Sequence, residues 1–282
     1  TIASQYTAAR RADGNKHPAW CEGVFELHYS DWKHLRLPDL TRELVIERQN
    51  KLAQDKGPQA STRGAKALRA LYKFAADQDI YDGTNFSKYA KVIESKPRKR
   101  VLKGDEHERV LAVLKDDKSL PSWVGPYFRL LLETGVRRSN LAGAEWKDFD
   151  LDAATWTIPG QKFKNGDDMR VLLTPEAVAI LRDQRMRHPE SPWVFPASTK
   201  RTQTGHLTDP WAGWQSVLDA AEVSGLTIHD LRRSVGSVLI SRGLTLAVVA
   251  KVLGHKDSRT TERHYAHADD EAVRAALGKL VA

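Results

Sequence analysis

The sequence has only one cysteine, Cys21, in 282 residues. An intramolecular disulfide and a cysteine-based zinc site are therefore excluded, which fits a reducing compartment. No apolar run approaches the roughly 20 residues that cross a bilayer, and no N-terminal stretch is typical of a secretion signal. The sequence also has no GxxxxGK loop followed by Ser or Thr that would cradle a nucleotide phosphate. We expect a soluble, cytoplasmic protein that uses no metal or organic cofactor.

The composition is that of a folded protein with a basic surface. Hydrophobic residues make up 41% of the chain and charged residues 28%, and the length allows two modest domains with cores of their own. Lys and Arg number 44 against 36 Asp and Glu, and residues 1–100 carry +7 of the net charge of +8. This excess favours a polyanionic partner such as DNA, although a basic solvated surface gives the same balance.

A basic segment separates two parts of the chain. Residues 96–103, KPRKRVLK, hold five cations and a proline, and such a charged segment stays extended by self-repulsion. We predict a linker over residues 97–103, between a first domain of residues 1–96 and a second of residues 104–282. Arg98, Lys99 and Arg100 are predicted to lie along a DNA phosphate backbone.

One helix stands out before the linker. Apolar residues recur at helical spacing over residues 61–77, and a hydroxyl of Ser61 or Thr62 is expected to cap the start. The opposite face carries four cations, which suit a helix lying on DNA and suit a solvated face equally well: Arg63, Lys66, Arg69 and Lys73.

The second part is mostly helical, with one β-rich interruption. Apolar spacing predicts helices around residues 110–114, 127–132, 178–181, 217–221 and 235–240. Residues 155–158 and 169–173 alternate or are β-branched, and Asn165-Gly166 lies between them, which predicts a hairpin with an exposed tip. Thr174 is expected to cap a helix with Pro175 at its first position. Residues 193–196, WVFP, are predicted to form a short strand at the edge of the sheet, where proline is tolerated.

Two short strings hold residues suited to phosphate chemistry. ETGVRRSNL, residues 133–141, places Arg137 after a glycine turn, and HDLRRS, residues 229–234, places His229 and Arg232 on one helix face. An imidazole accepts a proton near neutral pH, and a guanidinium holds phosphate oxygens in a bidentate fork. Each string alone is more typical of ordinary surface residues.

A third string, VLGHKDSRTTERHYAH, covers residues 252–267. Gly254 fits a left-handed helix end, His255 follows it, and Tyr265 comes ten residues later. A metal site built from His255, His264 and His267 has no carboxylate or cysteine to complete it, so we do not expect one. The hairpin adds Lys162 and Lys164 near its tip, where lysines are usually solvated.

In this order the strings resemble the tyrosine recombinases, the phage integrase family of mobile genetic elements. The shared features are an arginine after a TG turn, a hairpin lysine, HxxR, LGH, and a tyrosine about ten residues further on. The resemblance covers about residues 104–270. It implies a mainly α-helical, two-domain clamp around DNA, in which residues 1–96 form a core-type DNA-binding domain and the catalytic domain holds a small β-sheet. Many integrases carry a further arm-site domain, and because the chain starts at Thr1 rather than Met we expect a fragment.

The resemblance also implies how the phosphate is attacked. Arg137 and Arg232 would bind the non-bridging oxygens of the scissile phosphate, His255 would add a hydrogen bond, and Tyr265 would attack the phosphorus. A phenol has a pKa of about 10, so it needs cationic neighbours and a base to act as a nucleophile. The phosphodiester transition state likewise needs fixed positive charge.

Two further residues are implied as proton carriers. His229 would assist removal of the phenol proton, and Lys164, directly before Asn165-Gly166, would protonate the departing 5′ oxygen. Lys162 would replace it if the strand register slipped. The sequence departs from the family at Asn140, because the position three after the first arginine is commonly acidic and its charge would orient its neighbours.

The implied reaction is site-specific recombination of double-stranded DNA through a transient 3′-phosphotyrosine, without ATP or metal. Because two duplexes are exchanged, we expect a homotetramer associated with the nucleoid, with the amphipathic tail over residues 270–280 packing on a neighbour. Accessory DNA-bending proteins are compatible with this interpretation. Two alternatives remain: a type IB topoisomerase acting as a monomer without a defined site, and a DNA-binding regulator that kept the fold without the reaction.

Overall fold

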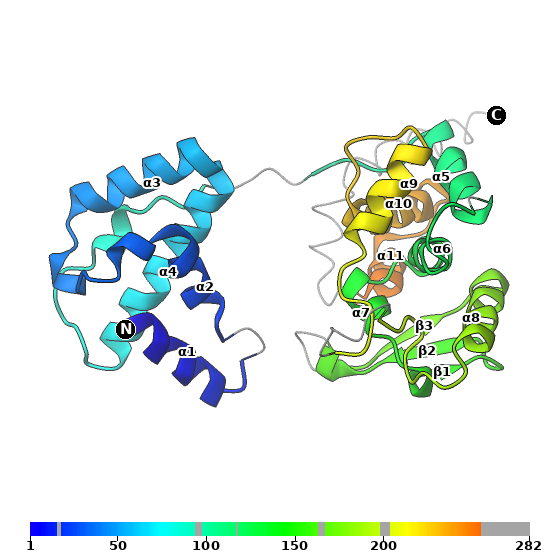
Figure 1. Cartoon of the computed structure of the whole chain (residues 1–282), viewed down its shortest axis with the longest axis horizontal. Helices are drawn as coiled ribbons and strands as arrows, with labels where there is room; N and C mark the ends of the chain where they lie inside the picture. Colours follow the sequence, from blue (N-terminus) through cyan, green and yellow to red (C-terminus); the bar gives the residue numbers. More distant parts are fainter. Residues whose placement is uncertain (16–17, 94–97, 117, 163–166, 198–203, 255–282) are drawn as a thin grey trace. The chain divides into compact units, whose positions relative to one another are not determined.

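The computed structural model describes residues 1–15, 18–93, 98–116, 118–162, 167–197 and 204–254. The chain divides into two compact units, Thr1–Pro97 and Arg98–Ala282 (Figure 1). Both units are mainly helical, and the second also holds a three-stranded sheet. The predicted fold class, mainly α with a small sheet, is confirmed. Among the described residues, no helix has the length and apolar character that crossing a membrane would require.

The first unit is a small helical bundle. Its elements are α1 (Ile2–Ala12), α2 (Trp20–His28), η1 (Ser30–Trp32), η2 (Leu37–Asp39), α3 (Arg42–Lys56), α4 (Pro58–Asp77) and η3 (Phe86–Tyr89). Helix α4 packs against α1, α2 and α3, and the apolar face predicted from the sequence is buried, at Leu68, Leu71, Tyr72 and Ala75. The helical periodicity of this segment is therefore confirmed.

The start of α4 differs from the prediction. The helix begins at Pro58, after Gly57 with φ +84°, because proline lacks an N–H and its fixed φ suits the first helical position. Ser61 and Thr62 are buried inside the helix and do not cap it. The Ser61 hydroxyl donates to the side-chain oxygen of Gln49 at 2.8 Å, and the Thr62 hydroxyl donates to the carbonyl of Ile93 at 3.2 Å. The two hydroxyls join α4 to neighbouring segments.

The second unit surrounds one central helix. Its helices are α5 (Asp105–Asp116), α6 (Val124–Thr134), α7 (Arg138–Ala142), η4 (Trp146–Asp148), η5 (Gly160–Lys162), α8 (Pro175–Arg187), α9 (Trp211–Ala220), α10 (Ile228–Ser241) and α11 (Leu246–Leu253). The predicted helical stretches fall on α5, α6, α8, α9 and α10. Helix α6 contacts α5, α8, α9 and α10, so it connects the sheet side of this unit to its other helices.

The sheet has the order β1-β2-β3, with β1 (Phe149–Asp150), β2 (Thr155–Ile158) and β3 (Met169–Leu172) all antiparallel. The pairing of Thr155 with Leu172 and of Ile158 with Met169 confirms the two predicted strands. Asn165-Gly166 at the predicted tip lies outside the described residues. Thr174 caps α8 as predicted, since its hydroxyl accepts from the backbone N–H of Ala177 at 3.1 Å.

The prediction that residues 193–196 join the edge of this sheet was wrong. The backbone N–H of Val194 donates to Ala144 at 3.0 Å, and the carbonyl of Phe195 accepts from Leu207 at 2.9 Å. Both side chains are almost fully buried, and the Phe195 ring lies 5.1 Å from that of Tyr127 on α6. Burial against the central helix therefore decides the position of this segment.

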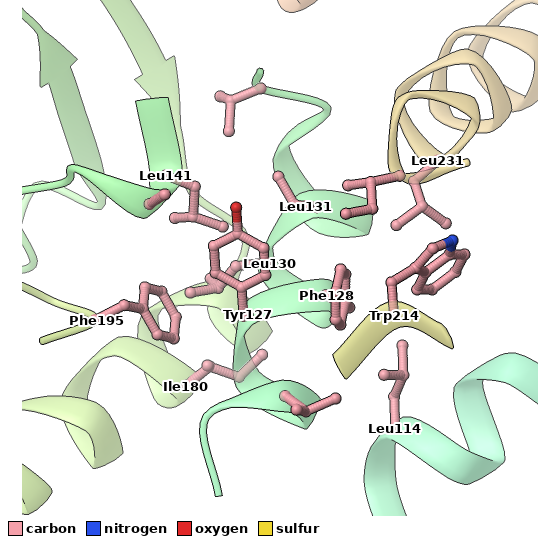
Figure 2. Close-up of a cluster of buried hydrophobic side chains, with 14 of the residues drawn as sticks. Leu114, Tyr127, Phe128, Leu130, Leu131, Leu141, Ile180, Phe195, Trp214 and Leu231 are labelled. Atoms are coloured by element: carbon pink, nitrogen blue, oxygen red, sulfur yellow. The ribbon is translucent and has the colours of Figure 1, made fainter. Parts of the chain in front are cut away.

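Aromatic rings form the centre of the second unit (Figure 2). The ring of Phe128 lies 4.9 Å from that of Trp214 and 5.1 Å from that of Tyr127. The indole N–H of Trp214 donates to the carbonyl of Leu226 at 3.1 Å, which satisfies the one polar group of this fully buried side chain. Trp214 thereby fixes α9 to the loop that leads into α10.

We predict that Trp214→Ala lowers the free energy of unfolding by about 3–5 kcal/mol, because it leaves a cavity and removes the donor to Leu226. Trp211→Ala is the matched control on the same helix, since the Trp211 indole is 47% exposed and its loss should cost only about 0.5 kcal/mol. Urea denaturation of both variants measures the difference. Equal losses would contradict the assignment of Trp214 to the core.

Candidate active site

Three separate chain segments meet at the guanidinium of Arg232. Arg232 lies on α10 and is 5% exposed. It donates from Nη1 to the carbonyl of Gly135 at 2.7 Å and from Nη2 to the carbonyl of Leu253. Gly135 directly follows α6, and Leu253 is the last residue of α11. The Arg232 side chain therefore joins the TG turn, the HxxR helix and the start of the LGH segment.

Glycine is required at both of the helix ends beside Arg232. Gly135 and Gly254 adopt left-handed conformations with φ +63° and +62°, which confirms the helix end predicted at Gly254. A Cβ at Gly135 would lie 2.9 Å from the Leu253 side chain, and a Cβ at Gly254 would overlap the sulfur of Met169 on β3. A side chain at either position would therefore strain the left-handed backbone and would have to displace the end of the Leu253 or Met169 side chain.

Arg137 is held at the start of α7. It occupies the position before the first helical residue, with extended backbone angles, and the Tyr127 hydroxyl donates to the carbonyl of the next residue, Arg138, at 2.7 Å. Burial lowers the pKa of Arg137 from its ordinary value. An arginine nevertheless stays protonated in proteins, so Arg137 supplies a partly desolvated positive charge.

A pocket of about 560 Å³ opens beside Arg137. It brings together Arg137 and His229, two of the residues that the sequence singled out, and the imidazole of His229 is exposed. The lining residues are Arg137, Arg138, Ser139, Asp209, Trp211, Thr227, Ile228 and His229. A positively charged wall next to an exposed imidazole suits an anionic substrate that exchanges a proton.

Arg232 is placed differently from the other two candidates. It lies three residues after His229 on α10, while its buried guanidinium is bonded to Gly135, two residues before Arg137. Arg232 thus borders the segment that carries Arg137. A guanidinium has five N–H donors, so it can hold backbone carbonyls and a phosphate oxygen together.

The remaining predicted catalytic residues, Lys164, His255 and Tyr265, lie outside the described residues, as does the tail over residues 270–280. Lys162 is the last residue of η5, directly before the undescribed hairpin tip. Within the part of the chain that the structure describes, no three His, Cys, Asp or Glu side chains are grouped to hold a metal ion.

Asn140 is buried on α7, and its Nδ2 has no hydrogen-bond partner among the described residues. The amide therefore stands in the interior, at the position where the resemblance implied an acidic side chain.

The predicted DNA-binding cations fall into two groups. Arg63, Lys66, Arg69 and Lys73 are all exposed on α4. Arg69 also donates to the carbonyl of Ala90 at 2.7 Å, and Lys73 pairs with Asp77 at 3.0 Å.

In the linker, Lys99 is exposed, whereas Arg98 and Arg100 bond to groups of the second unit. Arg98 donates to Gly225 at 2.8 Å, and Arg100 pairs with Glu106 at 2.5 Å. The hydrogen bond from Arg100 lowers the pKa of Glu106.

Three residues in or next to the pocket were not predicted from the sequence. Arg138 and Trp211 line the pocket, and Asp230, which follows His229 in the chain, is fully buried. The sequence did offer signals for two of them: Arg138 is a second arginine after the TG turn, and Trp211 is an aromatic residue directly after Asp209-Pro210. For Asp230, the helical register of HDLRRS puts it off the face shared by His229 and Arg232.

We predict that Arg232→Ala lowers the free energy of unfolding by about 2–4 kcal/mol, because two buried carbonyls lose a charged donor. Arg187→Ala is the control, since Arg187 is half exposed and paired with Asp183 on the surface, where the loss should stay below about 1 kcal/mol. Chemical denaturation measures both. An Arg232→Ala protein as stable as the control would show that the bonds from Arg232 to Gly135 and Leu253 do not stabilise the fold.

Comparison with known proteins places this site in a family. The model of the phage integrase family matches residues 100–272, more than half of the chain. The chain is 28% identical over 251 residues to the prophage integrase IntF of Escherichia coli strain K12, covering 82% of this chain and 50% of that protein. It is 28% identical over 224 residues to the tyrosine recombinase XerD of Caulobacter vibrioides, covering 74% of this chain and 71% of the relative. The chain thus spans only half the length of the E. coli protein.

Solved structures show the same fold. A lambda integrase dimer bound to a COC′ core site matches with a TM-score of 0.73 at 15% identity, over 93% of this chain and 75% of that one. The integrase of transposon Tn1549, in complex with transposon right end DNA, matches with a TM-score of 0.72 at 17% identity over the whole of both chains. The matched family region contains Arg137, His229 and Arg232, and the chain belongs to the phage integrase family.

Proposed function

We propose that this protein is a site-specific DNA recombinase that cuts and rejoins DNA strands through a covalent 3′-phosphotyrosine at Tyr265. One observation carries the assignment of the nucleophile. The second unit has two tyrosines, Tyr127 and Tyr265. Tyr127 is fully buried, its hydroxyl donates to the Arg138 carbonyl, and burial raises its pKa above the ordinary value. Tyr127 therefore cannot reach a phosphate, and Tyr265 is the remaining tyrosine of the unit that holds the two arginines.

The proposed cleavage conserves the energy of the phosphodiester bond. The phenol oxygen of Tyr265 forms a bond to phosphorus while the bond from phosphorus to the 5′ oxygen breaks. Arg137, Arg232 and His255 would stabilise the charge on the non-bridging oxygens. Attack by a 5′ hydroxyl on the phosphotyrosine then restores the phosphodiester and releases the tyrosine, so the cycle needs no ATP.

Two proton transfers accompany these steps. We propose that His229, exposed in the pocket beside Arg137, assists removal of the phenol proton, and that Lys164 protonates the departing 5′ oxygen. A positioned acid or base of this kind typically contributes about 10²- to 10⁴-fold to the rate. Lys162, at the end of η5, is the alternative acid.

The partners follow from the same proposal. A lambda integrase tetramer has been solved on a Holliday junction and matches this chain with a TM-score of 0.71 at 15% identity. We propose that the present protein likewise acts as a homotetramer on two synapsed DNA attachment sites, in the cytoplasm at the nucleoid. Accessory DNA-bending proteins stay a prediction. The relatives are named as integrases and recombinases, which favours recombination over the topoisomerase and regulator alternatives.

The first unit is proposed to grip the DNA through α4. Four cations are exposed on this helix while its apolar face is buried, so the positive charge points away from the core of the unit. When a basic helix face of this kind neutralises phosphates, counterions that were condensed on the DNA are released.

We predict that Tyr265→Phe abolishes covalent adducts with nicked attachment-site DNA while leaving DNA binding nearly unchanged, because only the nucleophilic oxygen is lost. Adducts are detected on denaturing gels and binding by fluorescence anisotropy. Tyr127→Phe is the matched control: it removes the hydrogen bond to Arg138 and should cost about 1 kcal/mol of stability while still forming adducts. Adducts from Tyr265→Phe, or none from the wild-type protein, would refute the proposed nucleophile.

We predict that replacing Arg63 and Lys66 with alanine weakens DNA binding and flattens its salt dependence, by about 0.9 in the log–log slope for each phosphate that is no longer neutralised. These two cations are preferred over Arg69 and Lys73, which also bond within the unit. Arg36→Ala is the control, because Arg36 is 81% exposed and paired with Asp39, away from α4 in sequence. An unchanged slope in the double variant would mean that these cations of α4 are solvated and do not contact phosphates.

A further inference from the structure

Asp230 is a fully buried carboxylate in the first turn of α10. Its neighbour His229 faces the candidate pocket, and Arg232 lies two residues further on. A buried charge is costly unless it is paired and hydrogen-bonded. The partners of the Asp230 carboxylate therefore show which segments it joins.

The Asp230 carboxylate bonds to both sides of the helix start. Its Oδ2 accepts from the backbone N–H and the hydroxyl of Thr227, at 2.8 Å each, and its Oδ1 accepts from Arg233 at 2.5 Å. Thr227 is the residue before the first turn of α10, so Asp230 satisfies a backbone donor that the helix itself leaves unpaired. These contacts fix the turn that carries His229.

A further partner comes from the segment that leads out of the first unit. Arg98 Nη2 lies 3.5 Å from Asp230 Oδ2 and donates to the carbonyl of Gly225 at 2.8 Å. The Arg98 side chain is 54% exposed, whereas the carboxylate is completely buried. Arg98 therefore covers the outer side of Asp230 and attaches the chain, at the first residue of the second unit, to the start of α10.

The next residues of this segment continue the attachment. Arg100 donates to the carbonyl of Ser224 at 3.1 Å. The backbone N–H of Leu102 donates to the Ser234 hydroxyl at 2.8 Å, and that hydroxyl donates to the carbonyl of Asp230 at 2.8 Å. Residues 98–102 are thus bonded to the loop before α10 and to the helix itself at three successive points.

We infer that Asp230 and Arg98 are positioning residues: together they tie the segment that follows the first unit to the helix turn that presents His229. In this role Arg98 holds the helix start through Gly225 and Asp230, in place of the DNA phosphate contact that was predicted for it from the sequence. Because of this pair, the placement of His229, and of Arg232 on the same helix, depends on how residues 98–102 are held. A misplacement of about 1 Å at a catalytic group can cost about 10²-fold in rate, so a loosened attachment should slow the reaction of fully bound DNA.

This inference rests on the proposed function, and its test separates positioning from phosphate contact. We predict that Arg98→Gln slows single-turnover adduct formation at saturating DNA by about 10- to 100-fold, with unchanged Kd and unchanged salt dependence of binding. Arg182→Gln is the matched control, because Arg182 is similarly exposed, at 59%, and paired with Asp152 on the surface. Its rate and Kd should equal those of the wild type.

Asp230→Asn should show the same loss of rate at saturating DNA. The double variant should be no slower than the slower single variant, because both substitutions break one attachment. Should Asp230→Asn fail to fold, as judged by its melting temperature, the comparison of Arg98→Gln with Arg182→Gln still decides. A weaker Kd with a flatter salt slope and an unchanged saturated rate would make Arg98 a phosphate contact. Unchanged rate and Kd, or additive losses in the double variant, would equally overturn the inference.

Amide hydrogen exchange provides a test that needs no catalysis. Arg98→Gln should speed exchange in residues 227–233 of the protein without DNA, and Arg182→Gln should not. Unchanged exchange in Arg98→Gln contradicts the attachment. An absence of adducts from the wild-type protein, together with the predicted exchange, would instead mean that the proposed function has failed.

Discussion

The arrangement of the candidate active site depends on one buried guanidinium that bonds to two backbone carbonyls. Arg232 on α10 reaches Gly135 at the end of α6 and Leu253 at the end of α11. Both helices end in a left-handed glycine, and the C-terminal ends of helices carry partial negative charge that favours a cation. Buried carbonyls need donors, and a buried cation needs acceptors, so each side requires the other. The motif segments that are far apart in the sequence are brought together by this requirement.

Other residues position the side chains beside the bonds that Arg232 makes. Arg137 follows Gly135 by two residues, and its neighbour Arg138 is fixed by the hydroxyl of Tyr127 in the aromatic core. His229 lies one turn before Arg232, on a turn that Asp230 holds from the inside. Groups that face the pocket are thus positioned by groups that do not. This is the arrangement that a phosphoryl transfer site needs, because its catalysis rests on placed charge more than on covalent chemistry by the protein.

Local features of the fold could be predicted from the sequence, and features set by distant contacts could not. The strands over residues 155–158 and 169–172 follow each other in the chain, and the Thr174 cap and the helix end at Gly254 depend on residues within a few positions, so their patterns were sufficient. The placement of residues 193–196, the burial of Ser61 and Thr62, and the partners of Arg98 depend on other parts of the chain. Arg98 and Asp230 are 132 residues apart, and a charge run in the sequence does not reveal which of its members will be bonded inside the fold.

We propose that Tyr265 carries the DNA during strand exchange, and mass spectrometry of the trapped intermediate tests this proposal most directly. The wild-type protein would be reacted with nicked attachment-site DNA, the covalent complex digested with protease and nuclease, and the modified peptide fragmented. We expect a nucleotide 3′-phosphate attached to the peptide that contains Tyr265. A nucleotide on Tyr127, on a tyrosine of the first unit, or on a serine would contradict it.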